Sequence, residues 1–243
     1  MSTAMLGRMT LSCPRRKARI AGFLYLIVIA GGIFAEIWVR GRLVVSGDAA
    51  ATAHNIMAHQ LLYRLGFAAE IFYCACNVPL ILIFYELFKI VNKNGALLVV
   101  YFSLVGTAVE SVSLLLHFAP LVLLGGGHYL SAFSAEQLQA LSYMSLRLFE
   151  YGFCICLVFF GCYCLVFAYL ICKSTFFPKF LAVLLVIEGF LYLTNSFANF
   201  LAPAAAARIF PYLAASGLAE VSLCLWLMIV GVNVERWREQ AAA

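Results

Sequence analysis

Each of the six long apolar stretches of this 243-residue chain carries one glutamate in its middle or outer part. The six glutamates are Glu36, Glu70, Glu110, Glu150, Glu188 and Glu220. A charged side chain at the centre of a membrane helix costs about 2.5–3.5 kcal/mol on insertion scales. Six such residues indicate a shared purpose, because carboxyl groups in lipid must hold protons, pair with cations or face a polar interior.

The stretch from residue 96 to residue 124 shows how one of these glutamates is embedded. Its small and polar residues follow the spacing i, i+3, i+7, i+10, i+14, which places them on one stripe of a helix. The stripe consists of Ser103, Gly106, Glu110, Ser113 and His117. Lipid cannot solvate this stripe, so it must face other helices or trapped water. We therefore predict a helix bundle with a polar interior.

Similar stripes surround the other glutamates, and we expect the stripes to converge on one polar cavity that opens to the outside. The predicted ligand-binding residues are Glu110, Glu188, Asn195, Asn199, Arg64, Glu70, Arg147 and Glu150. Glu110 and Glu188 lead this set because they lie near the predicted midplane. Only Arg64 and Arg147 are basic and within reach at the outer helix ends, so the cavity has an acidic excess that requires protons or a cation.

Composition fixes the class of protein. Hydrophobic residues make up 65% of the chain, charged residues only 11%, and the mean hydropathy is +1.00, whereas a soluble domain carries about 25% charged residues. The fold class is therefore all-α, a polytopic membrane helix bundle. The net charge of +5 does not indicate a nucleic-acid partner, because the basic residues gather at helix ends, where they set topology.

Length and punctuation predict six transmembrane helices. The expected spans are 20–39, 65–89, 96–124, 147–172, 179–202 and 213–234. Residues 1–19 form a basic cytoplasmic segment and residues 235–243 a cytoplasmic tail. The first apolar run is longer than the roughly 7–15 residues of a signal-peptide core, so we predict a retained span. Alternating apolar and polar residues within 125–146 predict a short amphipathic helix on the outer membrane surface.

The basic residues also predict the orientation. With both termini in the cytoplasm, eleven of the sixteen lysines and arginines lie on the inside and five on the outside. Cytoplasmic loops carry the excess of basic residues in membrane proteins. The prediction is therefore N-in and C-in.

Two other interpretations stay open. One is an intramembrane metal-dependent enzyme that uses Glu110 and His117 with His54 or His59, although His54 and His59 are spaced i, i+5 and not the i, i+4 of a helical zinc motif. The other is a structural or regulatory membrane partner, in which each glutamate merely holds helices together by about 0.6–2 kcal/mol. Nucleotide-binding and serine-hydrolase motifs are absent from the sequence and the histidines lack the pairing of membrane haems. We expect no cofactor, and the enzyme interpretation is the weaker one.

Several short motifs carry a resemblance to a known family. They are Arg19-Ile20-Ala21-Gly22-Phe23-Leu24-Tyr25-Leu26, Gly47-Asp48-Ala49 before Asn55-Ile56, Arg64-Leu65-Gly66, Tyr85-Glu86-Leu87 with Val91-Asn92, Phe177-Pro178-Lys179 and Leu225-Trp226-Leu227. From about residue 17 to 234 the chain resembles the bacterial family called domain of unknown function 4386. That resemblance implies a six-span integral membrane protein and supplies no catalytic residues.

The sequence thus favours a multi-pass protein of the bacterial inner membrane with a glutamate-rich, outward-facing core. The leading functional hypothesis is a binding or transport module for a small cation, a proton-coupled solute or an amphiphilic ligand. The lipid bilayer is its expected surrounding. The identity of the ligand and the oligomeric state do not follow from the sequence.

Overall fold

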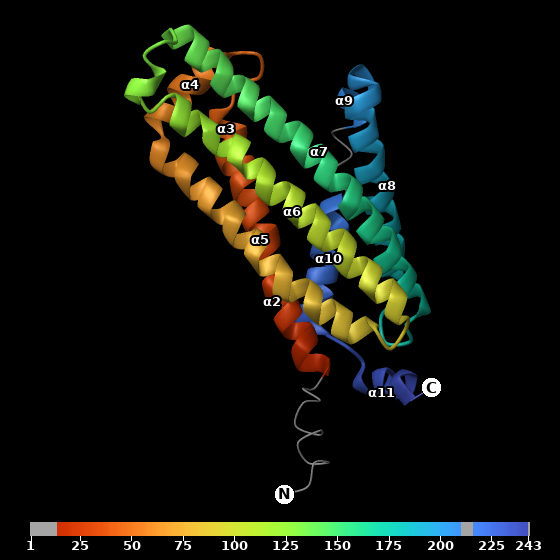
Figure 1. Cartoon of the computed structure of the whole chain (residues 1–243). Coiled ribbons are helices and arrows are strands. Elements are labelled where there is room, and N and C mark those ends of the chain that lie inside the picture. Colours follow the sequence, from red (N-terminus) through yellow and green to blue (C-terminus); the bar gives the residue numbers. More distant parts are fainter. Residues whose placement is uncertain (1–13, 210–215, 243) are drawn as a thin grey trace, which may run out of the picture.

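The computed structural model describes residues 14–209 and 216–242, and every regular element within those ranges is a helix (Figure 1). In chain order they are α2 (Pro14–Ile33), η1 (Phe34–Arg40, a π-helix), α3 (Gly41–Leu43), α4 (Ala49–Ala58), α5 (Gln60–Phe88), α6 (Lys93–Leu123), η2 (His128–Leu130, a 3-10 helix), α7 (Ala135–Lys173), α8 (Lys179–Leu201), α9 (Pro203–Ile209), α10 (Ser216–Ile229) and α11 (Val234–Ala242). The prediction of an all-α polytopic membrane bundle is confirmed.

Five helices in the described parts of the chain are long and apolar enough to cross a membrane. They are α5, α6, α7, α8 and the continuous rod Pro14–Leu43, which α2, η1 and α3 build together. A spanning helix needs about 20 apolar residues, and these five helices are between 23 and 39 residues long. The bundle is therefore assembled from helices that can each bury their backbone polar groups internally while they face lipid.

The sixth predicted span, 213–234, is divided in the structure. Helix α10 has 14 residues, a length of about 21 Å, and meets α11 at a bend of 96°; the two pass as one span only when taken together. Gly231 lies in the break with a φ of 73°, a conformation that glycine adopts without strain and that ends helices. The predicted beginning of this span lies outside the described residues.

Helix α7 is longer than expected. The sequence predicted a separate surface helix within 125–146 and a span over 147–172, but Ala135–Lys173 is one helix of 39 residues. It begins at a capping box, in which the Ser134 hydroxyl accepts from the Gln137 amide and the Gln137 side chain accepts from the Ser134 amide. Nothing between 135 and 173 breaks a helix, since this segment contains no proline, and the amphipathic turns simply continue into the span.

The two ends of the bundle differ. At one end, hereafter the termini end, lie the start of α2 and the helix α11, which contact each other (Figure 1). The main apolar core fills this half, and its centre is a phenylalanine cluster, Phe84, Phe88, Phe167, Phe176 and Phe177. The N-in and C-in orientation requires the start of α2 and the helix α11 to lie at the same end, as they do; the side of the membrane stays a prediction.

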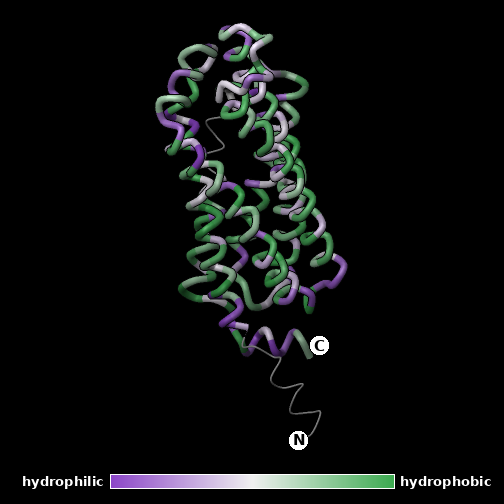
Figure 2. Tube along the Cα trace, turned by 60° about the vertical axis from the view of Figure 1, so that its left-hand side comes forward, coloured by the Kyte–Doolittle hydropathy of each residue, from purple (hydrophilic) through white to green (hydrophobic). Residues whose placement is uncertain are grey.

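At the other end, hereafter the α4 end, α4 packs against α7. The Asp48 carboxylate caps α4 by accepting from the Ala51 amide at 2.8 Å. Figure 2 shows that the chain is mainly hydrophobic along the body of the bundle, with hydrophilic segments towards both ends. Large apolar side chains such as Leu115 and Val112 are more than two-thirds exposed on that body, as expected for a surface that contacts lipid.

Candidate functional site

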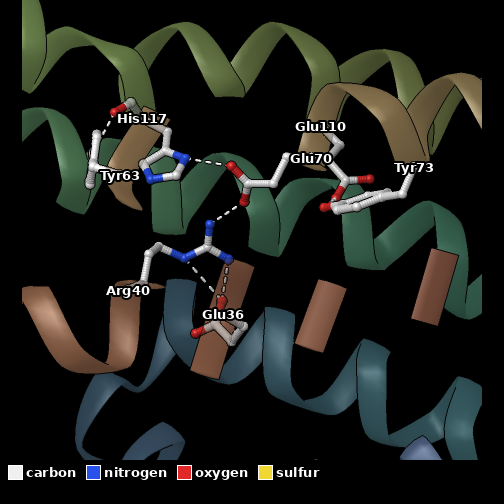
Figure 3. Close-up of polar contacts among 7 residues, drawn as sticks. All are labelled: Glu36, Arg40, Tyr63, Glu70, Tyr73, Glu110 and His117. Atoms are coloured by element: carbon white, nitrogen blue, oxygen red, sulfur yellow. Dashed lines mark hydrogen bonds and ion pairs between the residues drawn. The ribbon is translucent and has the colours of Figure 1, made fainter. Parts of the chain in front are cut away.

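A polar cluster joins three helical elements in the half of the bundle nearer the α4 end, and Figure 3 shows its side chains. It consists of Glu36 and Arg40 from η1, Glu70 from α5 and His117 from α6, and we call it the Arg40 cluster. The Arg40 guanidinium pairs with both the Glu36 and the Glu70 carboxylates. The other oxygen of Glu70 lies 2.5 Å from Nδ1 of His117. One arginine and one histidine thus hold the same buried carboxylate from two sides.

Local backbone structure brings Arg40 over Glu70. The π-helix η1 widens the end of the first rod, and π-turns of this kind are frequent at functional sites. Gly66 of α5 faces η1, and a Cβ at that position would lie 2.9 Å from the methyl carbons of Val39. The absence of a side chain at Gly66 therefore lets η1 approach α5 closely enough for the guanidinium to reach the carboxylate.

The cluster runs from the surface into the interior. The Glu36 side chain is 59% exposed, that of Arg40 is 13% exposed, and those of Glu70 and His117 are fully buried. The Phe149 ring of α7 covers Arg40, with the guanidinium carbon 4.8 Å from the ring centroid. A series of ion pairs thus leads from the exposed Glu36 to the buried His117.

His117 lies in an aromatic cage. Its ring centroid is 4.8 Å from that of Tyr63, 5.1 Å from that of Phe149 and 6.3 Å from that of Phe67. The Tyr63 hydroxyl donates to the backbone carbonyl of His117 at 2.5 Å. Because a carboxylate only accepts hydrogen bonds, Nδ1 must donate to Glu70. The second nitrogen, Nε2, is buried without a hydrogen-bond partner among the described residues.

A polar seam continues from this cluster along the interface of α5 and α6. The Tyr73 hydroxyl donates to Glu110 at 2.5 Å, and Figure 3 shows this pair beside Glu70. Farther towards the termini end, the Asn77 amide donates to the hydroxyls of Ser103 and Thr107 at 3.1 and 2.7 Å. Beyond Asn77, α5 contributes apolar residues to the phenylalanine cluster. The seam therefore ends inside the bundle.

A second polar cluster lies where α7, α8 and α10 meet. Glu188 of α8 is 1% exposed and its carboxyl interacts with Glu220 of α10, with Tyr192 and with the Cys164 thiol of α7. The Tyr192 hydroxyl donates to Glu220 at 3.2 Å. We call these four residues the Glu188 cluster. It brings two carboxyl groups into direct contact.

The predicted site residues fall into several places and not into one cavity. Glu70 and Glu110 share the α5–α6 interface, whereas Glu188 belongs to the second cluster. Asn195 and Asn199 lie farther along α8 and bond to each other, since the Asn199 amide donates to the Asn195 side chain at 3.3 Å. The remaining three are at the surface: Arg64 is exposed, and Arg147 pairs with Glu150 along one face of α7 with both side chains about half exposed.

The residues of the alternative metal site are also separated. His54 and His59 are exposed on and just after α4, while Glu110 and His117 have the partners described above. Within residues 14–209 and 216–242, no three histidine, cysteine, aspartate or glutamate side chains lie together as a metal-ligand set. The geometry therefore gives the metalloenzyme interpretation no support.

Sequence reasoning missed the residue at the centre of the cluster. Arg40 was counted as an outer-loop residue because the first span was predicted to end at 39, but the helical rod continues to Leu43. Its spacing of i, i+4 from Glu36 was the available signal, since such pairs lie on one helix face. Tyr63 and Tyr73 gave no signal, because tyrosine is common in membrane helices for other reasons.

Comparisons with known proteins identify a family and nothing closer. A family model described as "Domain of unknown function (DUF4386)" matches residues 20–231. No curated protein and no solved structure matches the chain.

Proposed function

Because this chain belongs to the DUF4386 family, whose description assigns no activity, we propose a function from its polar core alone: proton-coupled binding or transport of a small ligand across the bacterial cytoplasmic membrane. The Arg40 cluster would be the element that takes up the proton. The observation that carries this proposal is the buried, unpartnered Nε2 of His117 at the inner end of an ion-pair chain.

The charges of the cluster support proton uptake. With both carboxylates ionised and the imidazole neutral, Glu36, Glu70 and Arg40 carry one net negative charge. A proton on His117 would make the cluster neutral while the Glu70 hydrogen bond stays in place. Histidine is also the side chain whose unperturbed protonation changes between about pH 5 and 8. A monovalent cation or a ligand ammonium group bound at the cluster would also balance its one net negative charge.

The position of the cluster supports access from the α4 end. Glu36 is exposed, Arg40 is nearly buried, and His117 is fully buried, so a proton or ligand would meet these groups in that order. On the far side, the phenylalanine cluster closes the bundle towards the termini end. Transport would therefore require the helices that carry those rings to move, whereas binding from the α4 end would not.

The proposal is tested by counting protons. The detergent-purified chain is taken through a rapid pH drop in weakly buffered solution with a pH-sensitive dye, and the protons bound are compared with those of His117→Gln and Glu70→Gln. We expect His117→Gln to bind about one proton fewer, as one titrating site predicts. Phe67→Leu is the matched control, because it alters the cage around His117 without removing a titratable group, and it should bind as many protons as the wild type.

The outcomes separate the interpretations. If His117→Gln binds as many protons as the wild type but unfolds at a lower temperature, His117 is only a packing and hydrogen-bonding residue and the proposal fails. Proteoliposomes with an internal pH dye then distinguish transport from binding: proton entry that is lost in His117→Gln identifies transport. Uptake in detergent without entry into vesicles identifies a binding module.

A further inference from the structure

The Glu188 cluster contains a buried polar atom that lacks a hydrogen-bond partner among the described residues. Glu188 is 1% exposed and its Oε2 atom has no hydrogen-bond partner among the described residues. A buried carboxylate oxygen without a donor or cation is costly, because the charge has lost its water. The orphaned oxygen lies in a carboxyl group that already contacts a second carboxyl, that of Glu220.

The groups around the two carboxyls bring no compensating charge. Among the described side chains that interact with Glu188 or Glu220 are the Tyr192 hydroxyl and the Cys164 thiol, and none of them is basic. Two more tyrosines, Tyr25 of α2 and Tyr163 of α7, lie close enough to interact electrostatically with both carboxyls. The contrast with Glu70 is direct, since that carboxylate pairs with an arginine.

We propose that the Glu188–Glu220 pair is a binding site for a small monovalent cation. Carboxylate and hydroxyl oxygens are hard ligands, and they bind alkali cations and ammonium groups in preference to soft metals. The Tyr192 hydroxyl donates to Glu220 Oε1, so the unpartnered Glu188 oxygen is the one left to hold the ion. One cation reduces the charge of the ionised pair from two to one, and one proton shared between the carboxyls removes the rest.

A divalent or transition metal fits less well. Such ions need more protein ligands than this site offers, and among the described residues no three histidine, cysteine, aspartate or glutamate side chains are arranged to hold a metal ion. Glu220 is partly exposed, whereas Glu188 is almost wholly buried. An ion would therefore reach Glu188 by passing Glu220 between α8 and α10, two helices in contact.

This site stands apart from the Arg40 cluster, and cation binding there holds whether or not His117 takes up a proton. The test is thermal unfolding of the full chain in detergent at constant ionic strength. Sodium, potassium and methylammonium chloride are each compared with the chloride of N-methylglucamine, a cation too large for the site. A ligand that binds only the folded state raises the unfolding temperature as its concentration rises.

We expect at least one of the three small cations to raise the unfolding temperature in a saturable manner. Glu188→Gln should weaken the apparent affinity roughly tenfold or more, the equivalent of one lost charge-assisted contact. Glu150→Gln is the control: it removes a half-exposed carboxylate that pairs with Arg147 outside both clusters, and it should keep the cation response. A response to sodium or potassium alone identifies an inorganic ion, and one to methylammonium alone identifies an organic amine.

Two results would overturn the proposal. The first is a wild type that unfolds at the same temperature in all four chlorides. The second is a cation response that survives in Glu188→Gln and in Glu220→Gln alike, which would place the ion elsewhere. If Glu188→Gln does not fold, Glu220→Gln and Tyr192→Phe report on the same site, because they alter the Glu220 carboxylate and the hydroxyl that donates to it.

Discussion

Replacing Arg40 by methionine tests whether the Arg40 cluster is held together by charge. The substitution keeps a long, unbranched side chain beneath the Phe149 ring and removes the guanidinium that pairs with Glu36 and Glu70. Glu70, which is fully buried, is then left with His117 as its one described ion-pair partner. Breaking a buried pair by removing one partner costs about 3–5 kcal/mol, because a charge stays buried without compensation.

The structure reduces that figure. The Arg40 side chain is 13% exposed and its second partner, Glu36, is 59% exposed, so part of the interaction is screened by solvent. His117 can in addition neutralise Glu70 by accepting a proton. We therefore expect a loss of about 2–4 kcal/mol in the free energy of unfolding.

The assay is denaturant unfolding in mixed detergent micelles, followed by the circular dichroism of the helices. Arg147→Met is the matched control, because Arg147 pairs with Glu150 and both side chains are about half exposed; its cost should lie within about 0–1 kcal/mol. The double variant Arg40→Met with Glu70→Gln should recover much of the lost stability, since no unpaired charge remains. If Arg40→Met costs no more than Arg147→Met, the buried ion pair is not what joins η1 to α5.

Three further substitutions probe how the site is positioned. Gly66→Ala should destabilise the chain by about 1–3 kcal/mol by pushing η1 from α5, whereas Gly32→Ala, whose Cβ would meet nothing within 4 Å, should be neutral or stabilising; equal effects in unfolding experiments would contradict the close-approach argument. Asn77→Ala should cost about 1–3 kcal/mol by leaving two buried α6 hydroxyls unpaired, and an unchanged unfolding midpoint would show that water replaces the amide. Trp237→Phe removes the hydrogen bond to the Leu87 carbonyl, 3.0 Å long, so hydrogen exchange in α11 should rise while exchange in α5 stays constant; exchange that is unchanged in α11 would mean that other contacts hold it.

The sequence predicted which faces of the helices are polar, but not which helices those faces meet. All five members of the stripe on α6, from Ser103 to His117, are buried, as their spacing required. Spacing along one helix, however, says nothing about its neighbour. Glu110 meets Tyr73 of α5 and Glu188 meets Glu220 of α10, and no pattern within one helix distinguishes these pairings from the single cavity that was expected.

Departures from regular helix geometry also escaped prediction. The first rod continues through a π-helix to Leu43, and a π-turn adds a residue that a period of 3.6 does not describe. Arg40 was assigned to a loop because the apolar run ends at Val39, although the helical rod continues past it. Helix α7 was divided because an amphipathic pattern followed by an apolar one indicates two environments, although one uninterrupted helix can pass through both.

The length of α7 makes it a mechanical link between the membrane and the space beyond it. Its 39 residues extend over about 58 Å, while the hydrocarbon layer is about 30 Å thick, so the part that packs against α4 extends out of the lipid or tilts strongly within it. Because no proline interrupts α7, a displacement of the helix at the α4 end would also shift Phe149, the ring that packs against both Arg40 and His117.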